Sequence, residues 1–229
     1  MARIENHKYS IEEAFRECFY IVPDYQREYV WTDKEVHQLL EDINEQIDAG
    51  STREYFIGTV LVSPTDQKNH YEVIDGQQRL TTFFLLLCAL KHVFQGEPQR
   101  QVVSGLISTS YTDSDGETRT SLKLEPCYEN AGDVMTKLVE LDTDLQSVRA
   151  GIQAAGIPSF GSLENLVNAY GTLCRHLKGR TRPSPESTRN WKHSRCGVPN
   201  PSKSGTACSW RWLGMFGKRR LLRSDEGAS

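Results

Sequence analysis

One short segment, residues 71–82, places polar side chains where they could bind a phosphate group. It reads Tyr-Glu-Val-Ile-Asp-Gly-Gln-Gln-Arg-Leu-Thr-Thr, so a β-branched run ends in an acid and a glycine, and an apolar run follows a polar triplet. This order predicts a strand, a tight turn and a helix. Amides, a carboxylate and a guanidinium at a helix N-terminus suit a phosphate and its metal ion. The residues at this junction are Asp75, Gly76, Gln77, Gln78 and Arg79.

A structural alternative for this junction stays open. Asp75 could cap the helix, Gly76 could make the turn and Arg79 could pair with a carboxylate, since capping signals are common. The adjacent amides of Gln77 and Gln78 weaken this alternative, because Ser or Glu serves a helix start better than an amide does.

A second polar motif, Tyr25-Gln26-Arg27, lies in a loop rich in aromatic residues between Tyr20 and Trp31. Aromatic rings interleaved with a guanidinium can stack on bases or direct the guanidinium toward phosphate. Alternatively, the aromatic loop fills the core of its own domain. Because this motif and Asp75–Arg79 each follow a β-type run, we expect both to line one cleft.

The hydrophobic pattern predicts the elements that position these motifs. Ser10 and Thr32 each have the sequence context of a helix cap, and Gly58 within a strand predicts a bulge or a close approach of two backbones. The predicted strands are 19–22, a hairpin of 55–62 and 71–75, and a short strand at 122–124. The predicted helices are 11–18, 32–50, a buried central helix at 80–94, one near 134–141, and 162–177 capped by Ser162.

Charge divides the chain into an acidic body and a basic tail. Residues 1–174 carry 14 basic and 27 acidic side chains, whereas residues 175–229 carry 13 basic and 3 acidic ones. After about Gly179 the apolar periodicity stops, and proline, arginine and tryptophan become frequent. We expect 180–229 to be a disordered or non-native tail outside the fold, resembling out-of-frame translation or a decayed gene end. The alternative is a basic arm that binds DNA.

Several classes of protein are excluded by what the sequence lacks. The N-terminus has no apolar core of a secretory signal, and the longest apolar run is far shorter than the roughly 20 residues of a membrane span. The six cysteines form no C-x-x-C pair, and the six histidines have no metal-binding spacing. We therefore expect a reduced, cytoplasmic protein without a membrane partner.

Four blocks of sequence, occurring in order, resemble the N-terminal domain of GmrSD-type modification-dependent restriction endonucleases, a branch of the ParB/sulfiredoxin-like superfamily. The resemblance covers about residues 10–95. The blocks are Ile21-Val-Pro-Asp-Tyr-Gln-Arg-Glu-Tyr-Val-Trp31, Asp42-Ile43, Tyr55-Phe-Ile-Gly-Thr-Val60 and Val73-Ile-Asp-Gly-Gln-Gln-Arg-Leu-Thr-Thr82.

The resemblance implies an α+β, ParB-like small sheet with a buried central helix, followed by a helical segment and the disordered basic tail. In this interpretation residues 1–95 form a nucleotide-binding core, 96–179 a helical extension and 180–229 the tail. The implied function is nucleotide binding or hydrolysis and DNA sensing in phage defence. The cofactors are an NTP, as substrate or effector, and a divalent cation, most simply Mg²⁺.

The family motifs assign a role to each candidate side chain. The catalytic set is Asp75, Gln77, Gln78 and Arg79. In it, Asp75 binds the cation or orients water, and the two amides orient the nucleotide or the attacking water. The phosphate-binding set is Tyr25, Gln26, Arg27, Gly76 and Arg79.

Two alternatives to an enzyme remain. One is a nucleotide- or DNA-binding module without turnover that works with a separate nuclease, and the other is a nonfunctional gene remnant. Many family members carry a His-Asn-His nuclease domain, but His176 and His193 lack its sequence context. The partners we expect are therefore DNA and a nuclease subunit or domain that this chain, interpreted as truncated, does not contain.

Overall fold

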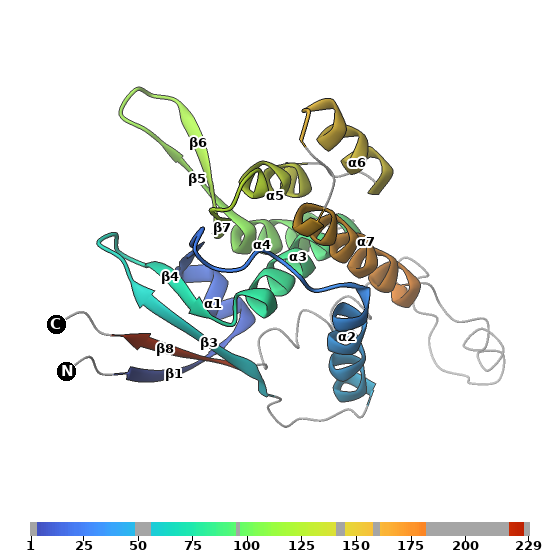
Figure 1. Cartoon of the computed structure of the whole chain (residues 1–229), viewed down its shortest axis with the longest axis horizontal. Helices are drawn as coiled ribbons and strands as arrows, with labels where there is room; N and C mark the ends of the chain where they lie inside the picture. The colour runs from blue at the N-terminus through green and yellow to red at the C-terminus, as the bar shows by residue number, and fades with distance from the viewer. Residues whose placement is uncertain are drawn as a thin grey trace.

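The computed structural model shows a six-stranded mixed sheet with helices around it, which confirms the predicted α+β class (Figure 1). It describes residues 4–48, 56–94, 97–140, 145–157, 161–181 and 220–226. In the order of the sheet, the strands are β1 Ile4–Ser10, β8 Arg220–Glu226, β3 Phe56–Pro64, β4 His70–Asp75, β2 Phe19–Val22 and β7 Leu124–Pro126. A separate hairpin consists of β5 Ser108–Thr112 and β6 Thr118–Leu122.

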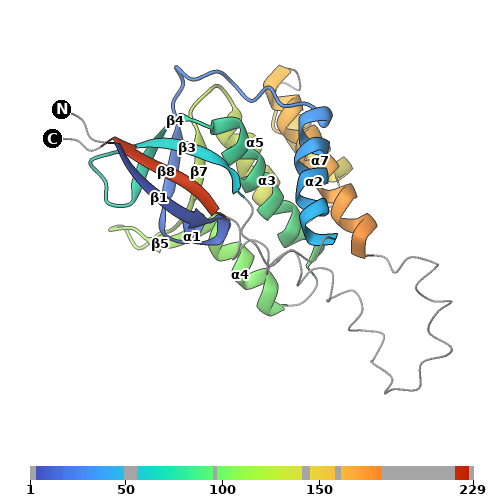
Figure 2. The same cartoon turned by 90° about the horizontal axis from the view of Figure 1, so that it is seen from below.

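The described helices are α1 Ile11–Glu17, α2 Asp33–Asp48, α3 Gln77–Val93, α4 Glu97–Ile107, α5 Ala131–Glu140, α6 Leu145–Ala154 and α7 Gly161–Thr181. Figure 2 shows α3 between the sheet on one side and α2 and α7 on the other. Every side chain of α3 from Leu80 to Leu90 is buried, as the apolar run predicts. Within the described residues, no helix combines the length and apolar character needed to cross a membrane.

Strand directions bring the two polar motifs together. The β3–β4 pair is antiparallel, as predicted for a hairpin, but β2 runs parallel to both β4 and β7. Tyr25-Gln26-Arg27 follows β2, and Asp75 is the last residue of β4. Because parallel strands end at the same edge of a sheet, both motifs lie at one edge, which is the usual place for a ligand site in such sheets.

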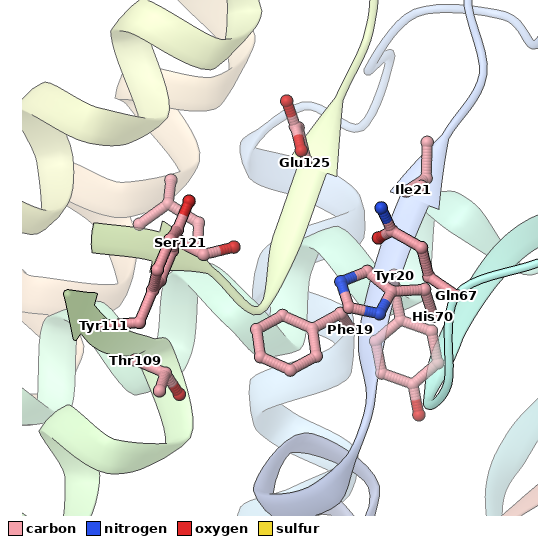
Figure 3. Close-up of a pocket in the computed structure, with 10 residues that line it drawn as sticks. Phe19, Tyr20, Ile21, Gln67, His70, Thr109, Tyr111, Ser121 and Glu125 are labelled. Carbon is pink, nitrogen blue, oxygen red and sulfur yellow. The ribbon is translucent and has the colours of Figure 1, made fainter. Parts of the chain in front are cut away.

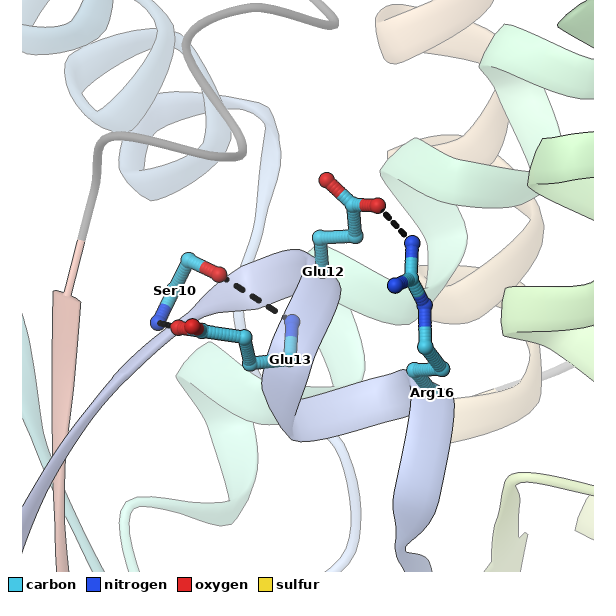
Figure 4. A network of polar contacts seen from close by, with 4 residues as sticks. All are labelled: Ser10, Glu12, Glu13 and Arg16. Carbon is cyan, nitrogen blue, oxygen red and sulfur yellow. Dashed lines mark hydrogen bonds and ion pairs between the residues drawn. The ribbon is translucent and has the colours of Figure 1, made fainter.

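The caps predicted at Ser10 and Thr32 are present, whereas Ser162 lies inside α7, which begins at Gly161. Figure 4 shows Glu13 donating its backbone N–H to Ser10 Oγ (3.1 Å), while its carboxylate accepts from the Ser10 backbone N–H (2.7 Å). At the start of α2, Glu35 Oε2 accepts from the backbone N–H of Thr32 at 2.8 Å, and the Thr32 hydroxyl accepts from the backbone N–H of Lys34 at 3.4 Å. The cap fixes the direction in which the chain leaves the 23–31 loop and enters α2.

The C-terminal part of the chain differs from the expectation. Residues 97–181 contain β5, β6 and β7 as well as helices, and the single strand expected at 122–124 is divided between β6 and β7. Residues 220–226 form β8, antiparallel to β1 and parallel to β3, so this part of the basic tail belongs to the sheet. The expectation that all of 180–229 lies outside the fold is therefore not met at β8; residues 182–219 and 227–229 lie outside the described residues. Backbone pairing on both sides holds β8 in place, which composition alone does not reveal.

Candidate functional site

The junction between β4 and α3 is a tight turn centred on Gly76, as predicted. Gly76 has φ of 86°, and a Cβ built on it would lie 2.7 Å from the Thr59 carbonyl oxygen of β3. Only glycine tolerates both this backbone conformation and this contact. Gly76 is also the N-cap of α3, and none of the described side chains forms a cap hydrogen bond to the helix. Asp75 therefore does not serve as the cap, and the first N–H groups of α3 have no side-chain acceptor among the described residues.

Arg79 lies across strand β3 at Gly58. A Cβ on Gly58 would be 2.2 Å from Arg79 Nη1 and 2.6 Å from Cζ, and Arg79 Nη1 is 3.5 Å from the Thr59 carbonyl oxygen. The β3 register also shifts between Phe56 and Thr59, which confirms the predicted bulge, and the close neighbour of Gly58 is the Arg79 side chain rather than a second backbone. Among the described residues, no carboxylate forms an ion pair with Arg79. Its charge is therefore not neutralised by a described neighbour.

The amides of Gln77 and Gln78 have a structural role that the sequence did not indicate. Both side chains are 6% exposed. Gln77 Nε2 donates to the Arg27 carbonyl at 2.6 Å, and Gln78 Nε2 donates to the Glu28 carbonyl at 2.9 Å. The Val30 backbone N–H donates to Gln78 Oε1 at 2.8 Å. The two amides thus hold the 25–30 loop against the start of α3 through part-buried hydrogen bonds to its backbone.

Contacts of Gln26 and Tyr25 join the loop to β4 as well. Gln26 Nε2 donates to the Ile74 carbonyl at 2.9 Å, and the Tyr25 hydroxyl donates to Glu72 at 3.0 Å. The loop motif and the junction are therefore adjacent, as the sequence predicted. Burial raises the pKa of Tyr25, and the hydrogen bond to Glu72 raises it further.

Of the two purposes considered for the aromatic loop, the structure shows one, the filling of the core. Tyr29 is buried, and its hydroxyl lies 2.8 Å from Thr82 Oγ1 in α3, so this ring fills the core. Tyr25 is 67% exposed and Arg27 is also exposed. Tyr25 and Arg27 of the motif are thus exposed to solvent, while Tyr29 anchors the loop.

Helix α7 holds the loop from the other side, through contacts that sequence reasoning did not find. The Ser162 hydroxyl donates to Glu28 Oε2 at 2.6 Å, and Asn165 Nδ2 donates to the Tyr29 carbonyl at 3.4 Å. Further along the same helix, the Thr172 hydroxyl donates to Asp33 Oδ1 at 2.6 Å. Ser162 carried only a capping signal, and nothing in its local sequence points to a partner 134 residues away.

The β4–α3 junction contains few protein side chains that could bind a metal ion. Among the residues that the structure describes, no group of three or more His, Cys, Asp or Glu side chains could hold a metal ion. Asp75 is exposed at the end of β4. A single carboxylate still suits Mg²⁺, which commonly keeps several waters and binds through one or two carboxylates plus the phosphates of a substrate.

A cavity of about 550 Å³ lies elsewhere, where β2 and β4 begin (Figure 3). It is bordered by residues of β2, β4, the β3–β4 turn, β5, β6 and β7, and none of the predicted site residues lines it. The β4–α3 junction and this cavity therefore lie at opposite ends of the same two strands, β2 and β4.

The fold and the junction together define a mixed α+β domain in which a polar loop and a glycine-centred strand–helix turn are joined at the ends of parallel strands. Residues 7–188 match the family described as GmrSD restriction endonuclease, N-terminal domain. The chain belongs to this family, which confirms the resemblance seen in the sequence blocks. A search of the curated proteins finds no match to the chain.

Proposed function

We propose that the β4–α3 junction binds the phosphate groups of a nucleotide in a DNA restriction system. The observation that carries this proposal is the pairing of an uncapped α3 N-terminus with the Arg79 guanidinium at Gly58, without a described carboxylate partner. Helix N–H groups and a guanidinium are complementary to phosphate oxygens. Membership of a restriction-endonuclease family supports the biological setting.

In this proposal each side chain has a distinct duty. Arg79 and the exposed Arg27 bind phosphate oxygens, and Asp75 binds a divalent cation or orients a water molecule. The cation, when bound, neutralises phosphate charge. Gln77 and Gln78 position the loop that carries Arg27 rather than contacting the nucleotide through their amide nitrogens, because those nitrogens already donate to loop carbonyls.

A binding module without turnover is the second candidate function. The engaged amide donors of Gln77 and Gln78 favour sensing over hydrolysis, because these amides already bond to the loop. In both versions DNA is cleaved by a separate nuclease. The acidic body, with 27 acidic and 14 basic side chains in residues 1–174, is unsuited to extended contact with a phosphate backbone. A ParB-like ancestry and a cytoplasmic location are part of the same proposal.

Calorimetric titration of the full chain with each NTP, with and without Mg²⁺, tests binding, and phosphate release tests turnover. Arg79→Ala should weaken NTP binding by about 1.5–3 kcal/mol, the range for a hydrogen bond to a charged group. The matched control is Arg119→Ala, which removes the same charge from the exposed β6 strand, where Arg119 pairs with Asp113. Equal affinity in wild-type and folded Arg79→Ala protein would contradict the proposal. Phosphate release above the Arg79→Ala background would select hydrolysis over sensing.

A further inference from the structure

The cavity at the start of β2 and β4 has aromatic and hydrogen-bonding walls that the proposed nucleotide site does not use. Figure 3 shows Phe19, His70 and Gln67 on one side, Thr109, Tyr111 and Ser121 on the other, and Glu125 between the two groups. The volume of about 550 Å³ lies within the usual range for small-molecule sites. The β5–β6 hairpin, which projects from the body in Figure 1, supplies one wall.

One wall contains an ordered stack of rings. The Phe19 and His70 ring centroids are 4.6 Å apart, with an interplanar angle of 5°. Lys123 Nζ lies 3.7 Å from the Phe19 centroid, and its ammonium also donates to the Arg16 carbonyl at 3.2 Å. A ring has two faces, and at these separations His70 and Lys123 must occupy opposite faces of Phe19. The order of the stack is therefore Lys123, Phe19 and His70, and the His70 imidazole is its outer ring.

The permanent charge at the cavity wall is negative. Among the described residues, neither lysine nor arginine lines it, and its acidic lining residue is Glu125. Buried Lys123 is only 4% exposed and is engaged beneath Phe19. A phosphate or carboxylate ligand is therefore disfavoured here.

We infer that this cavity binds a neutral planar heterocycle of the nucleobase type. Aromatic rings of Tyr111 and His70 provide stacking surfaces, and stacking on a base does not require charge. The Gln67 amide, the Ser121 hydroxyl and the Glu125 carboxylate provide donors and acceptors for the edge of the ring, and a carboxylate pairs well with an exocyclic amino group.

This second site is separate from the β4–α3 junction. His70 begins β4 and Asp75 ends it, and five residue steps along a strand span about 17 Å. The residues that line the cavity and those of the junction do not overlap. The inference therefore stands whether or not the junction binds phosphate.

The test titrates the full chain with adenosine and cytidine, which carry no phosphate, and follows binding by calorimetry and NMR. We expect millimolar or tighter dissociation constants, weaker binding of the 5′-monophosphates, and loss of about tenfold in nucleoside affinity in Tyr111→Ala. Tyr111 is 51% exposed, so this variant should remain folded. Glu125→Gln should reduce the preference for nucleoside over monophosphate.

Two control variants separate this site from the junction. Arg79→Ala should leave nucleoside affinity unchanged, and so should Tyr25→Ala, which removes an exposed tyrosine from the junction loop. A further titration uses a single strand of nucleic acid that contains bases and an abasic strand with the same phosphates. It shows whether the bound base belongs to nucleic acid or to a free nucleoside. Preference for the base-containing strand over the free nucleoside assigns the ligand to nucleic acid, and the reverse assigns a free nucleoside. Absence of nucleoside binding at about 10 mM, or binding lost in Tyr25→Ala but kept in Tyr111→Ala, would overturn the inference.

Discussion

Replacement of Gly58 by alanine tests whether stability and nucleotide binding require the Arg79 guanidinium to lie against β3 at Gly58. The new Cβ would lie 2.2 Å from Arg79 Nη1 and 2.6 Å from Cζ, well inside van der Waals contact. Gly58 also has φ of 130°, which an L-residue adopts only with strain of about 1–3 kcal/mol. Gly58→Ala should therefore displace the guanidinium and destabilise the fold.

Two assays separate these effects. Urea unfolding should show a loss of about 1–3 kcal/mol in the free energy of unfolding, from the backbone strain and the displaced side chain. NTP titration should show weaker binding, approaching the value for Arg79→Ala. The matched control is Gly105→Ala in α4, where a Cβ meets no atom within 4 Å and should stabilise the helix slightly.

A double-mutant cycle isolates the contact between the two residues. In an Arg79→Ala background the guanidinium is absent, so Gly58→Ala should cost only the backbone strain. We expect its cost to fall by about 1 kcal/mol relative to the wild-type background, since contacting residues are coupled by such amounts. If Gly58→Ala lowers the free energy of unfolding equally in both backgrounds, the reasoning is refuted, because the contact with Arg79 then contributes nothing to stability.

Three further predictions address the loop, the last strand and DNA cleavage. Gln78→Ala should lower the free energy of unfolding by about 1–3 kcal/mol, because it removes two part-buried hydrogen bonds, to the Glu28 carbonyl and from the Val30 N–H. Gln38→Ala, which loses only an exposed hydrogen bond to Asp42, is its control in the same urea experiment. Truncation after Thr181 removes β8 and should lower the melting temperature by several degrees, because β1 and β3 lose their shared neighbour. Truncation after Glu226 is the control, and an unchanged temperature in both would restore the interpretation of a tail outside the fold. The purified chain should not cut modified or unmodified plasmid with Mg²⁺ and NTP; cleavage that is lost in Asp75→Ala would contradict a separate nuclease.

Sequence patterns predicted the elements that depend on neighbouring residues. The Ser10 and Thr32 caps, the hairpin of β3 and β4, and the buried helix α3 all come from signals within a few residues of one another. Gly58 was recognisable for the same reason, since a glycine inside a strand pattern commonly marks a bulge or a close backbone approach. The motif that follows β4 was placed correctly at a strand–turn–helix junction, because turn chemistry is local.

The purpose of the two amides was not predictable in this way. Gln77 and Gln78 bond to carbonyls 50 residues earlier in the chain, so their role depends on how the loop after β2 packs against α3. The sequence around them shows only the local duties of an amide at a helix start, and those duties favoured a ligand. In the structure both of their nitrogens act as donors to the backbone of the loop.

Pairing between distant segments was decided by the tertiary structure alone. Ser162 reaches Glu28 from a helix 134 residues further along the chain, and β8 pairs with β1 from the opposite end of the sequence. Capping, turns and periodicity are encoded by adjacent residues, whereas these contacts form only when packing of the core brings the distant groups within hydrogen-bonding distance. The sequence by itself therefore determined the α+β elements and the position of the polar motifs, and the fold decided which groups hold the loop and which remain free for a ligand.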